Sequence, residues 1–534
     1  MVRLNSRASR IGATVIALIA TALMTGSATA APSQRLAGGA VRAAAAPVAG
    51  SCESLTALTL PNTAITSAAV AAASGTTPAS CRVHAQVTHP PAGDTENIDV
   101  WMPLEGWNGR FQGVGGGGYS GGSPQALALP VSQGYAAGST DTGHPGASGN
   151  FALDANGRLN WQLIRDNAYL GIHDMTVVGK AVVAAFYGRP AHHAYWNGCS
   201  TGGRQGLSEA QRYPNDYDGI LSAAPAINWS RFIPAELWPQ LVMLQAGDFL
   251  PQCKFAAFQA AAVQACDRLG DRVKDGVIGD PLRCDFDPRT QVGTVTPCGT
   301  ITAQDADVVA KILAGPRGSG GDFLWYGLTP GSSFAGLALT ATSGATTVGV
   351  PFPIALTHIG VWLLQNPSWD WTTATFAQYE QWFVQSVEEY TAVIGTDNPD
   401  LRAFKQAGGK LVIWHGLADQ LIFPQGTVNY YERVKALMGG AKKTEELARL
   451  FLAPGVAHCA GGAGPAPDNP LNAVVDWVEH GHAPRVLNGV LRDPSGTVTE
   501  TRPICLYPEV AAYKGHGEVT AASSFACRPA GSQG

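Results

Sequence analysis

Charged side chains are scarce in this sequence of 534 residues, because Asp, Glu, Lys and Arg together make up only 14%. A typical globular protein has about 25%. The net charge is −5, which gives no reason to expect nucleic acid or an anionic membrane as a partner. Hydrophobic residues make up 45%, enough for a large core and more than one domain. These values are typical of a globular, extracellular protein.

Long hydrophobic runs are also lacking beyond the N-terminus, so we expect no membrane-spanning helix in the rest of the chain. Near the start, three arginines precede the apolar run 11–24, and Ala-Thr-Ala at 28–30 has the form of a secretory cleavage site. The run is shorter than the roughly 20 residues that a spanning helix needs. We therefore interpret residues 1–30 as a signal peptide of a secreted protein and residues 31–50, rich in alanine, as a disordered lead-in.

Cysteine is present in an even number, which is informative in a chain that we expect to be exported. Disulfide bonds are the usual fate of such cysteines. The number alone leaves the pairing open. The ten residues are Cys52, Cys81, Cys199, Cys253, Cys266, Cys284, Cys298, Cys459, Cys505 and Cys527.

A Gly-x-Ser-x-Gly pattern surrounds Ser200, with Gly198 and Gly202 on either side. This spacing is typical of a nucleophile elbow, a sharp turn from strand to helix that exposes the serine hydroxyl. In a glycine-rich chain the pattern can also arise by chance. Residues 194–196 have the pattern of a strand and residues 206–213 that of a helix, and this context favours the elbow.

A serine nucleophile needs a histidine as base and a carboxylate that orients the histidine. Asp419 follows the apolar strand 411–414, and His458 follows the strand 450–453. An aspartate after a strand is often only a turn residue, and most histidines are not bases. However, the order serine, acid, histidine, each after a strand, is that of the α/β-hydrolase fold. We therefore predict a triad of Ser200, Asp419 and His458.

Strand and helix patterns alternate on both sides of a long segment that lacks this alternation. We predict an α/β-hydrolase core from residues 51–228 and 399–534, and an inserted lid from residues 229–398. The lid sequence is rich in Gly, Ser and Thr and has clustered aromatic residues. Most of these aromatics are expected in its core, with one or two in contact with substrate. The candidates are Trp325, Tyr326, Phe334, Phe352, Trp362, Trp369 and Trp371.

Four consecutive glycines, 115–118, follow the predicted strand 111–114. A glycine run after a strand leaves backbone N–H groups accessible, as an oxyanion hole requires, although a flexible surface loop would look the same. We predict that the N–H groups of Thr201 and of one glycine, Gly117, bind the oxyanion.

Two cysteines adjoin the predicted triad. Cys199 directly precedes Ser200, and Cys459 directly follows His458. If the triad forms, the two cysteines lie close enough for a disulfide bond. We predict that they are bonded and that the bond fixes the histidine loop to the elbow.

With these residues identified, the chain resembles the tannase and feruloyl esterase family of secreted serine esterases, which also includes hydrolases of terephthalate monoesters. The resemblance rests on residues 115–118, 138–144, 195–206, 216–219 and 458–459, and it covers most of the mature chain. It implies an α/β-hydrolase core, the same triad, the disulfide bond between Cys199 and Cys459, and a lid that shapes the substrate pocket.

The resemblance also implies a calcium site in the lid. Asp267, Asp271 and Asp275 would provide carboxylates, and Val273 and Val277 backbone carbonyls, which are the oxygen ligands that Ca²⁺ prefers. One departure is that the first two aspartates, Asp267 and Asp271, are four positions apart rather than three, and that Arg272 follows the second where the family has glycine. Asp267 is therefore the ligand that the resemblance supports least. The alternative is a solvated acidic turn closed by a disulfide bond.

For the remaining cysteines, the resemblance implies further disulfide bonds. Cys253 and Cys298 are then left to each other. The pairs are Cys52 with Cys81, Cys266 with Cys284, Cys505 with Cys527, and Cys253 with Cys298.

The predicted activity is the hydrolysis of aromatic acid esters through an acyl-enzyme on Ser200. Feruloyl, galloyl and terephthalate monoesters are all compatible substrates, whether small molecules or linked to plant polymers. A secreted peptidase, a triacylglycerol lipase and a catalytically inactive binding protein with this fold are the alternatives. The sequence leaves the oligomeric state open.

Overall fold

The structure is a computed structural model that describes residues 50–530. The predicted signal peptide and nearly all of the lead-in lie outside these residues. Residues 50–491 and 500–530 belong to one compact unit. Residues 492–499 do not belong to this unit. They contain a turn in which an oxygen of Asp493 accepts hydrogen bonds from the N–H groups of Ser495 and Thr497.

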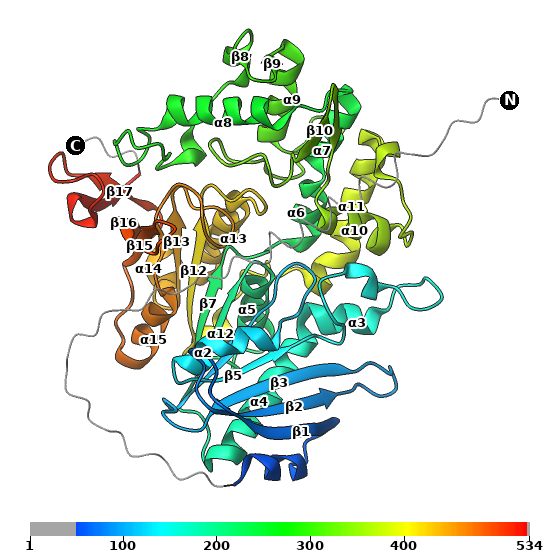
Figure 1. The fold of residues 1–534 in the computed structure, drawn as a ribbon, viewed down its shortest axis with the longest axis vertical. Coiled ribbons are helices and arrows are strands. Elements are labelled where there is room, and N and C mark those ends of the chain that lie inside the picture. The colour runs from blue at the N-terminus through cyan, green and yellow to red at the C-terminus, as the bar shows by residue number, and fades with distance from the viewer. Residues whose placement is uncertain (1–49, 531–534) are drawn as a thin grey trace. The chain divides into compact units, whose positions relative to one another are not determined.

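A nine-stranded sheet forms the centre of the large unit (Figure 1). Its order is β1-β2-β3-β5-β4-β6-β7-β12-β13. The first four strands in this order pair antiparallel, and the pairs from β5 to β13 are all parallel. The strands are β1 (Thr63–Ala71), β2 (Ser80–Val87), β3 (Glu96–Pro103), β4 (Arg110–Val114), β5 (Ala136–Thr140), β6 (His193–Cys199), β7 (Gly219–Ala223), β12 (Lys410–Gly416) and β13 (Ala448–Ala453).

Helices cover both faces of the parallel strands, which explains why these strands are apolar on both sides. In β12, Leu411 and Ile413 belong to one hydrophobic cluster, and Val412 and Trp414 belong to another. Helices α4 (Gly171–Tyr187) and α5 (Thr201–Arg212) pack on the sheet, as do α13 (Pro424–Met438) and α15 (Pro470–His480). This is the α/β architecture that the alternating pattern predicts.

The segment between β7 and β12 adds no strand to this sheet in the described structure. Most of its buried apolar residues belong to one hydrophobic cluster, which Tyr119, Ile164 and Phe423 from outside the segment also join. We call this segment, residues 229–398, the lid; that it is a separate domain stays a prediction. Its elements are α6 (Trp229–Glu236), α7 (Trp238–Ala246), α8 (Gln252–Cys266), η6 (Pro281–Arg283), η7 (Pro288–Gln291), β8 (Val295–Thr296), β9 (Gly299–Thr300), α9 (Ala303–Ala314), β10 (Thr340–Ser343), β11 (Thr346–Gly349), α10 (Pro353–Thr357), η8 (His358–Leu363), η9 (Trp371–Thr373) and α11 (Phe376–Ile394).

Local sequence explains where two of the lid helices begin. Both α9 and α11 start with a capping box, in which Thr302 pairs with Asp305 and Thr375 with Gln378. Each box satisfies backbone N–H groups that a helix leaves unpaired at its start. The lid is thus more helical than its lack of a strand and helix alternation suggested.

The remaining elements connect and flank the sheet. They are η2 (Cys52–Ala57), η3 (Pro124–Leu127), α2 (Ala128–Ser132), η4 (Gly149–Ala152), α3 (Trp161–Arg165), η5 (Asp166–Leu170), α12 (Arg402–Gln406), α14 (Ala441–Thr444), β14 (Ala466–Pro467), β15 (Val486–Arg492), β16 (Val498–Cys505), β17 (Glu509–Tyr513), η10 (Ala522–Ser524) and β18 (Phe525–Pro529).

Among residues 50–530, one helical run is long and apolar enough to cross a membrane, which the sequence analysis missed. It extends over Trp161–Tyr187 and thus joins α3, η5 and α4. Half of its most apolar window is buried, and α4 packs against β3 and β5. In this structure the run is therefore a core helix that covers the sheet. A buried core helix meets the same length and composition criteria as a spanning helix.

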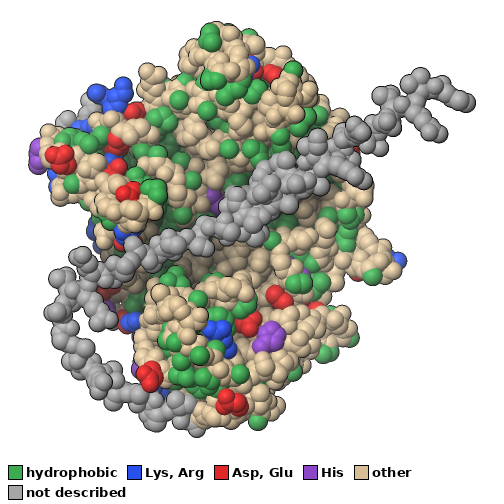
Figure 2. All heavy atoms as spheres, in the orientation of Figure 1, with side chains coloured by type: hydrophobic (Ala, Val, Ile, Leu, Met, Phe, Trp, Pro, Cys, Tyr) green, Lys and Arg blue, Asp and Glu red, His purple; other side chains and the backbone are tan. Residues whose placement is uncertain are grey.

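The surface reflects the low content of charge. On the face in Figure 2, acidic and basic side chains are sparse and lie among one another. The described cysteines are all paired, in the five disulfide bonds expected from the sequence: Cys52–Cys81, Cys199–Cys459, Cys253–Cys298, Cys266–Cys284 and Cys505–Cys527.

Candidate active site

Ser200 occupies a strained turn between β6 and α5. Its φ of 62° and ψ of −124° lie outside the regions that non-glycine residues prefer, and such a conformation costs on the order of 1–3 kcal/mol. A Cβ atom on Gly198 would lie 2.4 Å from the carbonyl carbon of Gly202. Only glycine fits at position 198, which explains the first glycine of the Gly-x-Ser-x-Gly pattern. Ser200 is partly exposed, and its side chain makes no capping hydrogen bond to α5.

Asp419 and His458 lie in the loops after β12 and β13. Because these strands are parallel neighbours, their carboxyl ends meet at one edge of the sheet. The Nδ1 of His458 is 2.8 Å from Oδ2 of Asp419. Cys199 and Cys459 are bonded, with their Cα atoms 5.9 Å apart. The two cysteines are 260 positions apart in the sequence, and their bond links the backbone beside Ser200 to the backbone beside His458.

The Asp419 carboxylate is fully buried and accepts several hydrogen bonds. Its Oδ1 accepts from the N–H groups of Leu421 and Ile422, at 2.9 Å each. Burial acts to raise the pKa of Asp419, but the adjacent imidazoles of His458 and His415 outweigh it and hold this pKa well below its usual range. Asp419 is therefore a carboxylate at neutral pH and can orient the His458 imidazole.

His415, at the end of β12, is a second histidine bound to this carboxylate, and sequence reasoning missed its role. Its Nε2 is 3.1 Å from Asp419 Oδ2 and 3.1 Å from the Ile422 carbonyl, and its Nδ1 is 2.8 Å from the hydroxyl of Thr427. Both partners of Nε2 are acceptors only, so Nε2 carries the proton. The only signal in the sequence was a histidine four residues before the acid.

The glycine run 115–118 is held against the start of α5. The Gly202 N–H donates to the Gly116 carbonyl at 2.9 Å, and the Thr201 hydroxyl donates to the Gly118 carbonyl at 2.6 Å. Thr201 is the first residue of α5, where a helix has no carbonyl to pair with the N–H. Gly117 is exposed on this loop. The N–H groups predicted for the oxyanion hole therefore lie on two segments that are hydrogen-bonded to each other.

The lid extends to this region. The Cδ1 of Ile354, on α10, would lie 3.0 Å from a Cβ on Gly118. On the acid side, the Thr329 hydroxyl donates to the Leu417 carbonyl at 2.6 Å. Of the predicted aromatic wall, Trp325, Phe334 and Trp362 are buried in the hydrophobic cluster of the lid, and Tyr326, Phe352 and Trp369 are partly buried against it. Most of the seven candidates thus pack in the core, as expected.

A large cavity lies elsewhere in the described structure. Its volume is about 860 Å³, and its walls include residues of the 281–289 loop and of α13. None of Ser200, Asp419 and His458 lines it. It is therefore not the space in which the triad would meet a substrate.

The acidic loop of the lid surrounds an arginine. Arg502 donates to Asp271 at 2.9 Å, to Asp275 at 2.8 Å and to Glu500 at 2.7 Å. Asp267 instead accepts from the N–H group of Gly276, at 3.0 Å. The predicted ligands Val273 and Val277 are buried in the same loop.

The donor set of this loop fits a hard cation, although its side chains are arranged around Arg502. Three carboxylates face one guanidinium, and carboxylate and carbonyl oxygens are the ligands that Ca²⁺ prefers. The three predicted aspartates are not among the described clusters whose ligand atoms all lie within 4.8 Å of one another. Arg272, which replaces the expected glycine, has a φ of 72°. The backbone at position 272 thus has the left-handed conformation that favours glycine, although the residue here is arginine.

An exposed serine on a strand-to-helix turn, with an acid and a histidine after two later parallel strands, defines an α/β-hydrolase. The comparisons narrow this class. The family model for tannase and feruloyl esterase matches residues 81–528. A probable feruloyl esterase of Arthroderma benhamiae is 43% identical over 459 residues, covering 84% of this chain and 85% of that protein. A mono(2-hydroxyethyl) terephthalate hydrolase of Piscinibacter sakaiensis is 32% identical over 505 residues, covering 80% of each chain.

Solved structures agree with this result. Feruloyl esterase B from Aspergillus oryzae superposes with a TM-score of 0.78 at 28% identity, covering 89% of this chain and 99% of that one. Tannin acyl hydrolase from Aspergillus niger gives a TM-score of 0.80 at 26% identity, covering 88% and 92%. The chain belongs to the tannase and feruloyl esterase family and is a carboxylic ester hydrolase.

Proposed function

We propose that the chain hydrolyses esters of phenolic acids, such as feruloyl or galloyl esters, with Ser200 as nucleophile. His458 removes the proton from the Ser200 hydroxyl as the oxygen attacks the ester carbonyl. Asp419 keeps the imidazole in the required tautomer and stabilises its positive charge. His458 then protonates the leaving alcohol, and an acyl-enzyme remains. Water attacks this intermediate with His458 again as base, and the free acid is released.

The backbone N–H groups of Thr201 and Gly117 stabilise the negative charge on the carbonyl oxygen in both steps. Loss of one such donor typically costs about 10² to 10³ in rate. Support comes from the hydrogen bonds that join the glycine run to the start of α5. A rigid pair of donors does not have to reorganise as charge develops, and this makes the stabilisation large.

The observation that carries the proposal is the hydrogen bond between His458 and Asp419, together with the disulfide bond between Cys199 and Cys459. Ser200→Ala should abolish hydrolysis of methyl ferulate and labelling by a fluorophosphonate probe, with an unchanged melting temperature. Ser208→Ala, on the helix α5 that follows Ser200, is the control and should retain both activities. If Ser200→Ala still turns over substrate, another nucleophile is at work and the proposal is wrong.

The proposal also specifies the acyl group of the substrate, a phenolic acid. The relatives named above are feruloyl esterases, a tannin acyl hydrolase and a terephthalate monoester hydrolase. A panel of ferulate, caffeate, gallate and mono(2-hydroxyethyl) terephthalate esters distinguishes these substrates. We expect the highest kcat/KM on ferulate or gallate. A preference for the terephthalate monoester would assign the alternative within the same family.

We also propose that the chain is secreted, with residues 1–30 as its signal peptide. Five disulfide bonds support this, because such bonds persist in oxidising compartments. N-terminal sequencing of protein from the culture medium should begin near residue 31. A mature protein that starts at residue 1 inside the cell would contradict the proposal.

We further propose that the acidic loop of the lid binds one Ca²⁺ through Asp267, Asp271 and Asp275 and through the carbonyls of Val273 and Val277. Support comes from the excess of three carboxylates, those of Asp271, Asp275 and Glu500, over one guanidinium. The ion would neutralise this loop and stabilise the fold. Chelation and dialysis should remove one calcium per chain and lower the melting temperature, and Asp275→Asn should reproduce this effect. No bound calcium and no change in stability would refute it.

A further inference from the structure

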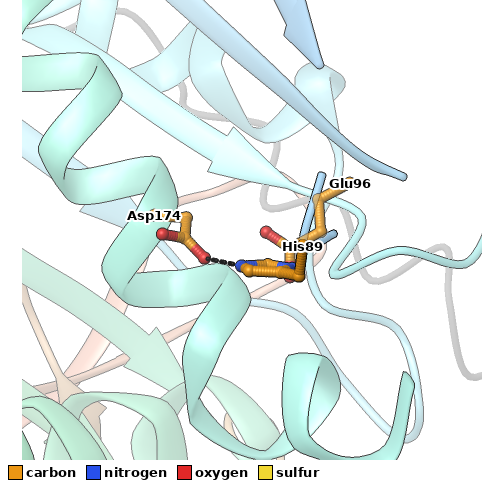
Figure 3. Close-up of side chains that lie close together, drawn as sticks. All are labelled: His89, Glu96 and Asp174. Atoms are coloured by element: carbon orange, nitrogen blue, oxygen red, sulfur yellow. Dashed lines mark hydrogen bonds and ion pairs between the residues drawn. The ribbon is translucent and has the colours of Figure 1, made fainter. Parts of the chain in front are cut away.

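Acidic side chains and a histidine gather at the start of β3, outside the triad. His89 and Asp94 lie in the loop between β2 and β3, and Glu96 is the first residue of β3. Asp166 begins η5, and Asp174 lies on α4. Figure 3 shows the His89 imidazole directed toward Asp174, with Glu96 beside the ring. Two separate stretches of the chain, residues 89–96 and 166–174, thus contribute to one cluster.

The two nitrogens of His89 have different partners. Its Nδ1 is 2.6 Å from Oδ2 of Asp94, and its Nε2 is 3.1 Å from Oδ2 of Asp174. One ligand atom each of His89, Glu96 and Asp174 lies within 4.8 Å of the other two. When a carboxylate accepts a hydrogen bond from one ring nitrogen of histidine, it fixes the tautomer and directs the other nitrogen to a metal.

Glu96 is the observation that points to a ligand. The residue is fully buried, and neither of its carboxylate oxygens has a hydrogen-bond partner among the described residues. The fully buried Asp166 also has one oxygen without a partner. A buried carboxylate without a partner is costly, and buried carboxylates are normally paired or bound to a metal. The strand fixes the backbone of Glu96, so the side chain cannot turn out to solvent.

If all four carboxyl groups of the cluster are ionised, their charges do not balance. Four carboxylates, of Asp94, Glu96, Asp166 and Asp174, surround the imidazole of His89. Within the described chain, the ion pairs of these carboxylates involve His89 and no lysine or arginine. An imidazolium bridging Asp94 and Asp174 would leave Glu96 without a partner. A divalent cation beside Nε2 would supply the missing positive charge and contact Glu96 directly.

We propose that His89, Glu96 and Asp174 bind a divalent transition-metal ion, such as Zn²⁺ or Mn²⁺, with Asp94 orienting the imidazole. The imidazole favours these ions over Ca²⁺ and Mg²⁺, which prefer oxygen ligands. His89 and Asp174 are partly exposed, with 24% and 23% of their side-chain surface accessible. Solvent therefore has access to the ligands. The ion would tie the β2–β3 loop and β3 to α4, so its role is structural.

The test uses the full mature chain, stripped with a chelator and then saturated with Ca²⁺ so that the lid loop is the same in every sample. Zn²⁺ and Mn²⁺ are titrated separately by calorimetry, with metal analysis and melting temperatures. The wild type should bind one ion of at least one of the two metals per chain and melt at a higher temperature with it. Glu96→Gln keeps the side-chain shape and should weaken this binding at least 100-fold.

Matched variants separate this site from other metal-binding side chains. Asp94→Asn should weaken binding about 10- to 100-fold, as for other carboxylates that orient a metal-bound histidine. His84→Gln is the control, because His84 pairs with Asp99 at 3.2 Å on β2 and β3 without a third ligand. It should bind the ion as the wild type does. Asp174→Asn, a substitution of a partly exposed residue, repeats the test if Glu96→Gln does not fold.

Two outcomes would overturn the proposal. In one, neither ion binds to the wild type in a stoichiometric amount or raises its melting temperature. In the other, binding is as tight in the Glu96→Gln and Asp174→Asn variants as in the wild type. Either result would assign His89 as an imidazolium that only bridges Asp94 and Asp174.

Discussion

The disulfide bond between Cys199 and Cys459 should affect both stability and catalysis. It closes a segment of 260 residues, whereas the bond between Cys505 and Cys527 closes one of 22. The loss of chain entropy that such a bond imposes on the unfolded state corresponds to about 5–6 kcal/mol for the longer segment and about 3 kcal/mol for the shorter. The paired variants Cys199→Ala/Cys459→Ala and Cys505→Ala/Cys527→Ala should lose stability in this order.

The catalytic effect distinguishes the two bonds more sharply. Without the first bond, the loop of His458 is no longer covalently fixed to the elbow of Ser200. A misplacement of about 1 Å can cost 10²-fold in rate, so we expect kcat on methyl ferulate to fall about 10- to 100-fold. The control pair should keep its kcat. Denaturant unfolding gives the stabilities, and steady-state kinetics are measured at a temperature where both variants are folded.

Equal values of kcat in the two variants would refute the reasoning. Such a result would mean that the hydrogen bonds around Asp419 position the histidine loop without the covalent bond. A loss of kcat in the control would also contradict it, because Cys505 and Cys527 join β16 to β18 and do not adjoin the triad.

Three further predictions concern single residues. Asp419→Asn should lower kcat about 10⁴-fold. The pKa of Asp419 is lower in the folded state than in the unfolded state, so the carboxylate stabilises the fold above about pH 4, and this contribution is lost as the pH falls further. In an acid titration the variant should therefore lose less stability than the wild type does. His415→Phe removes a hydrogen-bond donor to Asp419 and should lower kcat about tenfold, with unchanged KM and a shifted pH profile of kcat. An unchanged pH profile would exclude a positioning role for His415. Gly115→Ala places a Cβ 2.5 Å from the Gly202 Cα and should lower the unfolding free energy by about 1–3 kcal/mol, whereas Gly117→Ala meets no atom within 4 Å and should leave it unchanged, as thermal melts would show.

The features that were predictable from the sequence are those that local geometry dictates. The elbow requires glycine at 198 because a Cβ there would lie 2.4 Å from the backbone of Gly202, and a Cβ on Gly202 would be tightly packed, 3.2 Å from the Gly116 carbonyl oxygen. These constraints are visible as a spacing in the sequence. Asp419 and His458 could be predicted because each follows an apolar strand, and parallel strands end at the same edge of a sheet. The start of α11 could also have been read from its capping box.

Features that depend on distant contacts could not be predicted in this way. His415 lies at the end of a buried strand, and nothing nearby in the sequence shows that its ring reaches Asp419 and Thr427. His89 and Asp174 are 85 positions apart and meet only because α4 packs beside β3. Arg502 likewise joins the acidic loop from more than 200 positions away. These contacts depend on the packing of whole elements, which no local pattern encodes.

The bond between Cys199 and Cys459 has a consequence for a protein exposed to proteases. The whole lid, residues 229–398, lies within the covalent ring that this bond closes. A single cut anywhere in the lid therefore opens the ring but does not divide the molecule, because the two fragments stay joined through sulfur. A nicked enzyme would migrate as one species without reductant and as two with it, and the fragments that carry Ser200 and His458 would remain tethered to each other.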